Sequence, residues 1–81
     1  MEVTFYSRPG CHLCERAETV LRELAEELPI TVKKINIDDS DEWTEKYGLM
    51  IPVLEVDGQI ILYGQIVKDE ARNRLQQLLS N

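Results

Sequence analysis

The two cysteines of the chain, Cys11 and Cys14, have the types and spacing best suited to chemistry. They are the only cysteines in the sequence, and two residues separate them. A disulfide between them would close a loop too short to restrict the unfolded chain much, so it would add little stability. Cysteines that can bridge but cannot stabilise are better explained by redox chemistry or by metal binding.

The positions of the two cysteines predict different roles for them. Cys11 stands at the predicted start of a helix, where unpaired N–H groups and the helix dipole favour a thiolate by about 0.3–1 kcal/mol, or ~2 kcal/mol when partly buried. Arg8, three residues earlier, would add a positive charge nearby. Cys11 is therefore the candidate nucleophile. Cys14 falls near the apolar stripe of the same helix, which suits a less exposed, resolving thiol.

His12, between the cysteines, has two interpretations. A protonated imidazole there would stabilise the thiolate or relay a proton, whereas a purely structural residue would simply face solvent on the first turn. Zinc is the other explanation for a Cys-X-X-Cys pair beside a histidine. A closed tetrahedral site needs four ligands, and this turn offers three Cys or His candidates.

The elements that must position these residues alternate along the chain. Strands are predicted at 2–6, 30–37, 53–56 and 59–63, and helices at 13–28, at about 41–47 and at about 67–78. The first helix rests on apolar residues that recur at three- and four-residue steps, and Pro29 ends it. The order β-α-β-α-β-β-α predicts a mixed four-stranded sheet with helices packed on it, in one domain covering residues 1–81.

Two strand features lead to local predictions. The alternation of apolar and polar residues in the second strand is interrupted between Val32 and Ile35. This interruption predicts a bulge or a one-residue shift near residues 33–34. Asp57-Gly58 lies between two strand-like runs and predicts a hairpin with a two-residue type I′ turn.

The second helix has signals at both ends. Residues 38–40 (Asp-Asp-Ser) supply candidate caps, and Asp39 with Glu42 fits a capping box. Gly48 follows the last helical residues and suits the left-handed position that ends many helices.

Composition narrows the class of protein and of partner. Apolar residues make up 43% of the chain and charged residues 30%, as in ordinary soluble globular domains. The net charge of −6 argues against nucleic acid and against an anionic membrane surface. The sequence shows neither a membrane-length apolar run nor a leader-like start. We therefore expect a cytoplasmic protein, where a cysteine pair is kept reducible.

At this point a family resemblance appears. Residues 11–14 (Cys-His-Leu-Cys) after a strand and opening a helix, followed by Ile51-Pro52 before a hairpin, resemble the thioredoxin superfamily. The short length and the Arg8-to-Cys11 spacing are most like its glutaredoxin-like branch. The resemblance covers essentially the whole chain and implies an α/β, thioredoxin-like fold. It also implies that Cys11 is the nucleophile, that Cys14 resolves, that Pro52 is a cis-proline facing the pair, and that the Ile51 backbone pairs with substrate.

The chain departs from both branches of that superfamily. Glutaredoxins usually have Thr-Val-Pro where residues 50–52 are Met-Ile-Pro, and a Gly-Gly pair for glutathione near residues 62–64, here Leu-Tyr-Gly. These departures argue against glutathione binding. Thioredoxins have a buried acid on the strand before the motif, which residues 3–6 lack, and a Trp where Gly10 stands.

The sequence thus predicts a thiol–disulfide oxidoreductase, expected to be a monomer without a bound cofactor. Its substrate would be a disulfide-containing protein or small molecule, and its reductant a reductase flavoprotein or glutathione. Two alternatives remain open. One is a homodimer that holds an iron–sulfur cluster through Cys11, as some glutaredoxins do, with glutathione or a substitute as co-ligand. The other is a redox-silent interaction domain that retains the fold.

Overall fold

The structure, a computed structural model, describes residues 1–80. Its elements are β1 (Glu2–Ser7), α1 (His12–Glu27), β2 (Thr31–Asn36), a 3₁₀ helix η1 (Ile37–Asp39), α2 (Asp41–Tyr47), β3 (Val53–Val56), β4 (Gln59–Tyr63) and α3 (Lys68–Ser80). The predicted order of strands and α-helices is confirmed, and η1 is an addition to it. Within the described residues, no helix has the length and apolar character needed to cross a membrane.

The four strands form one mixed sheet in the order β2-β1-β3-β4. β1 and β2 are joined by α1 and pair in parallel, as predicted. β3 pairs antiparallel with both β1 and β4. The carboxyl end of β1 and the amino end of β3 therefore lie at the same edge of the sheet. That edge is where the chain leaves β1 for Cys11 and where Pro52 leads into β3.

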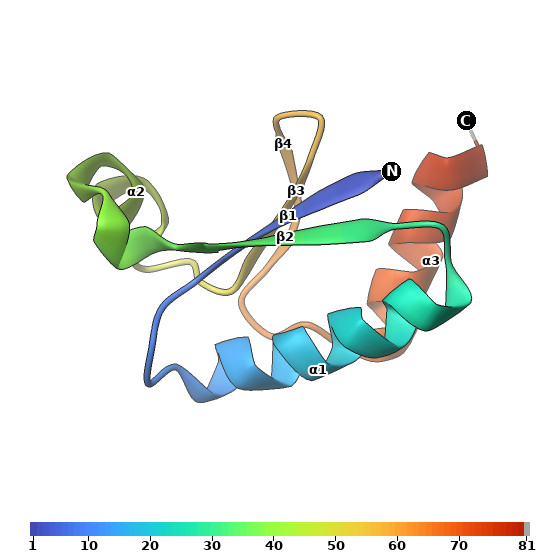
Figure 1. Ribbon diagram of the computed structural model, residues 1–81, viewed down its shortest axis with the longest axis horizontal. Coiled ribbons are helices and arrows are strands. Elements are labelled where there is room, and N and C mark those ends of the chain that lie inside the picture. The colour runs from blue at the N-terminus through green and yellow to red at the C-terminus, as the bar shows by residue number, and fades with distance from the viewer. Residues whose placement is uncertain (81) are drawn as a thin grey trace.

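The two faces of the sheet carry separate apolar clusters. α1 and α3 cover one face, and α2 lies at the other side near the edge that carries the cysteines (Figure 1). Phe5 and Leu54 belong to the larger cluster under α1 and α3. Tyr6 and Val53, their chain neighbours, belong to the smaller cluster under α2. This alternation is the period of two expected when both faces of a strand are buried.

The bulge predicted near residues 33–34 is absent, and that prediction is wrong. β2 pairs with β1 without interruption from Glu2↔Thr31 to Ser7↔Asn36. The alternation is interrupted for another reason: Val32 packs against the larger cluster, whereas Ile35 packs against the smaller one on the opposite face. The sheet has its irregularity in the hairpin instead, where the β3–β4 register shifts between Leu54 and Glu55.

The predicted hairpin turn is confirmed. Asp57 and Gly58 both have positive φ angles, of 52° and 78°, as a type I′ turn requires.

One of the candidate caps of α2 is confirmed, and two other predictions about its ends are wrong. Ser40 is the N-cap, and its hydroxyl accepts the N–H of Trp43 at 3.3 Å. The Asp39–Glu42 capping box is therefore wrong by one residue, because Asp39 belongs to η1. Gly48 is right-handed (φ −54°, ψ −34°) rather than left-handed. A Cβ at Gly48 would meet the carbonyl oxygen of Thr44, so lack of space, rather than a special φ, favours glycine there.

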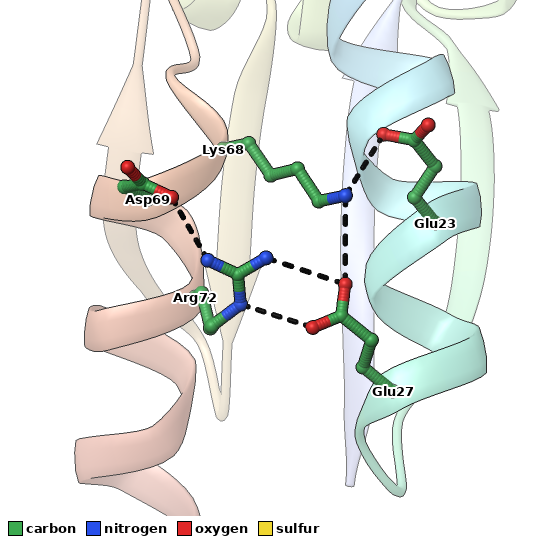
Figure 2. Close-up of polar contacts among 5 residues, drawn as sticks. All are labelled: Glu23, Glu27, Lys68, Asp69 and Arg72. Carbon is green, nitrogen blue, oxygen red and sulfur yellow. Dashed lines mark hydrogen bonds and ion pairs between the residues drawn. The ribbon is translucent and has the colours of Figure 1, made fainter.

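An ion-pair network ties α3 to α1 (Figure 2). The Arg72 guanidinium donates to both carboxylate oxygens of Glu27, at 3.0 and 3.3 Å, and to Asp69 at 2.8 Å. Lys68 pairs with Glu23 and Glu27 at 3.3 and 3.5 Å. The hydrogen bonds from Arg72 are the largest cause that lowers the pKa of the Glu27 carboxyl from its usual value. The network links the two helices at the protein surface.

Candidate functional site

The cysteine pair lies directly beyond the carboxyl end of the central strand β1. After Ser7, the chain turns through Pro9 and Gly10, whose φ of +80° is in the region that favours glycine. Cys11 and Cys14 form a disulfide, with their Cα atoms 5.2 Å apart. The pair is therefore held between a buried strand and the first turn of α1.

Cys11 is the N-cap of α1. Its backbone is extended (φ −98°, ψ 108°), and its Sγ accepts the backbone N–H of Cys14 at 3.1 Å. An N-cap side chain normally supplies an oxygen to a free N–H of the first turn. Here the acceptor is sulfur, and a negatively charged sulfur gains more from this donor than a neutral thiol does. The geometry thus favours a thiolate at Cys11.

Cys14 is far less accessible than Cys11. Its exposed fraction is 3%, and it belongs to the larger core cluster with Ala17 and Leu21 of the same helix face. Cys11 is half-buried and packs against that cluster from its edge. An incoming disulfide would therefore meet Cys11 first.

Arg8 is placed close to the pair but is engaged with Asp38. Its Nε and Nη2 atoms donate to one oxygen of the Asp38 carboxylate at 3.0 and 2.7 Å. The two residues follow the carboxyl ends of the adjacent parallel strands β1 and β2, where the last pair in register is Ser7↔Asn36. The negative charge of Asp38 therefore offsets part of the positive charge of Arg8, which we expect to stabilise the Cys11 thiolate. The role of Arg8 stays a prediction, and the sequence predicts for Asp38 only a position as a candidate helix cap.

His12 opens α1 and points away from the core. Its side chain is 92% exposed, and Nδ1 lies 3.4 Å from a carboxylate oxygen of Glu15, one turn along the helix. This geometry leaves both interpretations of His12 in place, since the ring is near the cysteines in sequence but pairs with the carboxylate of Glu15.

Pro52 stands at the same edge of the sheet as the cysteines. The Ile51–Pro52 peptide bond is cis, as the resemblance implies. Tyr6 pairs with Val53, so the preceding Pro52 is level with Ser7, where the chain turns toward Cys11. Ile51 and Cys11 both pack against the cluster that contains Cys14.

The backbone around the cis-proline is tied to its neighbours. The Ile51 N–H donates to the carbonyl of Tyr47 at 3.1 Å, and the Gly64 N–H donates to the carbonyls of Met50 and Pro52 at 3.0 and 2.9 Å. A substrate strand pairing with the Ile51 N–H would have to displace the first of these bonds.

An open cavity of about 430 Å³ lies on the α1–β2 side of the pair. Cys14 lines it, together with Arg8, Glu18 and Lys34. Lys34 pairs with Glu18 at 3.0 Å, which ties the second turn of α1 to the edge strand. None of these contacts is predicted by the sequence motifs; the parallel pairing of β1 and β2, which puts Lys34 beside Phe5, brings Lys34 to this cavity.

A second polar cluster lies on the opposite face, under α2. The carboxylate of Glu55 accepts the hydroxyl of Tyr47 at 2.6 Å and that of Tyr6 at 3.4 Å, and the two tyrosine rings stack with centroids 4.2 Å apart. Burial, followed by the Tyr47 hydrogen bond and the Glu55 charge, raises the pKa of Tyr6 to about 12. This cluster is a core feature, and it holds β1 and β3 to α2.

Among residues 1–80, no group of three or more His, Cys, Asp or Glu residues is placed to hold a metal ion.

Comparison with known proteins places this geometry in a family. The family Glutaredoxin-like domain (DUF836) matches residues 2–76. The chain belongs to this family. A glutaredoxin-like protein of Dictyostelium discoideum is 29% identical over 85 residues, covering 98% of this chain and 79% of that protein. A thioredoxin of Methanocaldococcus jannaschii is 26% identical over 72 residues, covering 85% of each chain.

Solved structures agree with this placement. A structural genomics target protein from X. campestris is 30% identical, with a TM-score of 0.79 over 93% of this chain and 96% of that one. Membership of the glutaredoxin-like family is thus shown. A thioredoxin of Halobacterium salinarum, 25% identical and with a TM-score of 0.71 over 94% of this chain and 72% of that one, shows the thioredoxin fold. The Cys11–Cys14 disulfide within that fold fits a redox role.

Proposed function

We propose that this glutaredoxin-like protein is a thiol–disulfide oxidoreductase that works through Cys11 and Cys14. The observation that carries the proposal is the N-cap geometry: the Cys14 N–H points at the Cys11 sulfur, and Cys14 itself is buried behind it. An accessible sulfur that is favoured as thiolate, next to a buried partner within bonding reach, provides a nucleophile and a resolving thiol.

The proposed reaction has two exchange steps. The Cys11 thiolate attacks one sulfur of a substrate disulfide, forms a mixed disulfide and releases the first substrate thiolate. The Cys14 sulfur then attacks Cys11, loses its proton and releases the second substrate thiolate. The two cysteines lose two electrons and become the disulfide seen here, and the substrate gains the same two electrons. The substrate is a disulfide-containing protein or small molecule.

A dithiol donor, such as a reductase flavoprotein, is the proposed source of electrons, with glutathione a poor one. The Gly64 N–H, the backbone donor beside the cis-proline, is already bonded to two carbonyls. Tyr63, which is 60% exposed, puts a large side chain where glutaredoxins carry a small one. The net charge of −6 would also slow the approach of an anionic tripeptide. We propose the reducing cytoplasm as the compartment and a monomer as the working form.

Turnover with two donors tests this function. Protein oxidised at Cys11–Cys14 is mixed with insulin as a protein disulfide, and with either dithiothreitol or glutathione plus glutathione reductase. We expect turnover with dithiothreitol and none for Cys11→Ser. With glutathione, we expect a rate at least about tenfold below that of a glutaredoxin, a barrier difference of ~1.4 kcal/mol. No turnover with either donor would overturn the oxidoreductase proposal. A glutathione rate within tenfold of the glutaredoxin would overturn the choice of donor.

A further inference from the structure

The open cavity on the α1–β2 side contains Cys14, and Cys11 is not among its lining residues. This matters because the second exchange step needs the thiol of Cys14 to lose its proton. Cys14 is 3% exposed and lies in an apolar cluster, and a thiol in such surroundings holds its proton more tightly than one in water. The cavity is the side from which a proton acceptor and solvent reach it.

Four charged side chains face this cavity from three parts of the chain. Arg8, in the loop after β1, is bonded to Asp38. Glu15 of α1 is directed toward His12. The remaining two are Glu18 of α1 and Lys34 of β2, which pair with each other. Both carboxylates can accept a proton, so helix geometry must distinguish between Glu15 and Glu18.

Helix spacing places Glu18, rather than Glu15, on the face of α1 that carries Cys14. Residues four apart lie on the same helix face, one turn above each other, and helical side chains lean back toward the N-terminus. The Glu18 side chain therefore covers the turn that carries Cys14. Glu15 is only one residue beyond Cys14, so it projects about 100° round the helix. Lys34, held at 3.0 Å from Glu18, keeps that carboxylate on the cavity side of the helix.

We propose that Glu18 accepts the proton of Cys14 during the resolving step and that Lys34 is its positioning residue. This inference rests on the proposed function. As the Cys14 S–H bond breaks, the proton passes to the Glu18 carboxylate and the sulfur forms a bond to Cys11. The bond from Cys11 to the substrate breaks, and the substrate leaves as a thiolate with the electron pair. Glu18 then returns its proton to solvent or to that thiolate.

A chromogenic disulfide separates the two steps. Reduced protein is mixed with excess 5,5′-dithiobis(2-nitrobenzoate), so that attack by Cys11 releases a first equivalent of coloured thiolate. Attack by Cys14 then releases a second equivalent in a first-order phase that is independent of reagent concentration. We expect Glu18→Gln to leave the first phase unchanged and to slow the second about a hundredfold near pH 7, at the lower end of what a positioned proton acceptor contributes. The pH dependence of the second phase should move upward.

Matched variants control for charge and for folding. Glu26→Gln removes a negative charge, as Glu18→Gln does, but from an exposed site on α1. Lys33→Gln removes a positive charge, as Lys34→Gln does, from the neighbouring residue of β2. Both control variants should leave the second phase unchanged. Lys34→Gln should slow it by a smaller factor than Glu18→Gln does. Circular dichroism and thermal melting confirm that each variant is folded.

Each outcome of this experiment decides between named alternatives. A second phase in Glu18→Gln that is within twofold of wild type overturns the inference. A faster second phase also overturns it, because it would show that Glu18 acts only as a negative charge that disfavours the Cys14 thiolate. Absence of a second phase in the wild-type protein would instead overturn the proposed function, since Cys14 would then not resolve the mixed disulfide.

Discussion

Asp38 should make the Cys11 thiolate less favourable, because its carboxylate pairs with Arg8, the positively charged residue nearest to Cys11 in the sequence. The Arg8 guanidinium donates two hydrogen bonds to one Asp38 oxygen. Replacing Asp38 by Asn removes a negative charge and leaves the charge of Arg8 uncompensated. Both changes favour the thiolate of Cys11, so the direction of the effect is fixed: the variant should react faster at pH values where the thiol is mostly protonated.

The size of this effect follows from distance and exposure. The Cα atoms of Arg8 and Cys11, three residues apart, lie at most about 10 Å from each other, and we take that value as the distance between the charge and the sulfur. A unit charge at about that distance is worth ~1.7 kcal/mol at an effective dielectric constant of about 20, and ~0.4 kcal/mol in water. The side chains of Arg8 and Asp38 are 36% and 47% exposed, so solvent brings the value to about 0.4–1 kcal/mol. That corresponds to a thiolate fraction roughly two- to fivefold higher.

Alkylation of Cys11 measures this change directly. In a Cys14→Ser background, the rate of reaction with iodoacetamide is followed against pH at low ionic strength. Asp38→Asn should react about two- to fivefold faster below the midpoint, and high salt should shrink the difference.

Asp39→Asn is the matched control for that assay. It removes the same charge from the next residue, which makes no ion pair within residues 1–80. The gain should also vanish when Arg8→Ala is added to Asp38→Asn. A rate for Asp38→Asn equal to or below that of Asp39→Asn would refute the electrostatic argument.

Three further predictions concern the scaffold. Glu55→Gln weakens the hydrogen bonds to Tyr6 and Tyr47, so urea unfolding should show a loss of about 1–3 kcal/mol. The pKa of Tyr6 is raised to about 12, so its neutral form contributes stability that is fully present below about pH 10 and is lost as pH rises through about 12. In Glu55→Gln, absorbance at 295 nm should show Tyr6 titrating at a lower pH than in wild type. Gly48→Ala introduces a contact with a backbone carbonyl, so the same urea measurement should show a loss of about 1–3 kcal/mol; an unchanged midpoint would contradict it. Arg72→Gln removes the largest cause that lowers the pKa of the Glu27 carboxyl. Stability from the Arg72–Glu27 pair is present above the usual Glu range and is lost as pH falls through the lowered pKa, so the urea midpoint of the variant should fall less steeply with acid than that of wild type.

Most of the fold could be predicted from the sequence because its signals are local. The apolar spacing of α1, Pro29 after it and Asp57-Gly58 in the hairpin each specify their own segment. The errors arose where a residue has two plausible local explanations. The interrupted alternation at Val32 and Ile35 looks like a bulge until both faces of β2 are known to be covered. Gly48 looks like a left-handed cap until its distance from Thr44 is known.

The site was predictable only as far as the motif extends. Cys11 as an N-cap and Cys14 in the core follow from helix spacing, and the structure shows both. The partners of the motif come from a later part of the chain: Asp38 of η1 bonds Arg8, and Lys34 of β2 pairs with Glu18 of α1. Pairings across a parallel crossover depend on strand register, which a single sequence does not determine to one residue.

Trapping of the mixed disulfide tests the assignment of Cys11 and Cys14 most directly. The Cys14→Ser and Cys11→Ser variants are each incubated with a protein disulfide, quenched with acid and alkylated, and the adducts are identified by mass spectrometry. The proposed mechanism predicts that Cys14→Ser accumulates a covalent adduct through Cys11, because no thiol remains to resolve it, and that Cys11→Ser accumulates none. An adduct on Cys14 in the Cys11→Ser variant, with none on Cys11 in the other, would contradict the account and reverse the two roles.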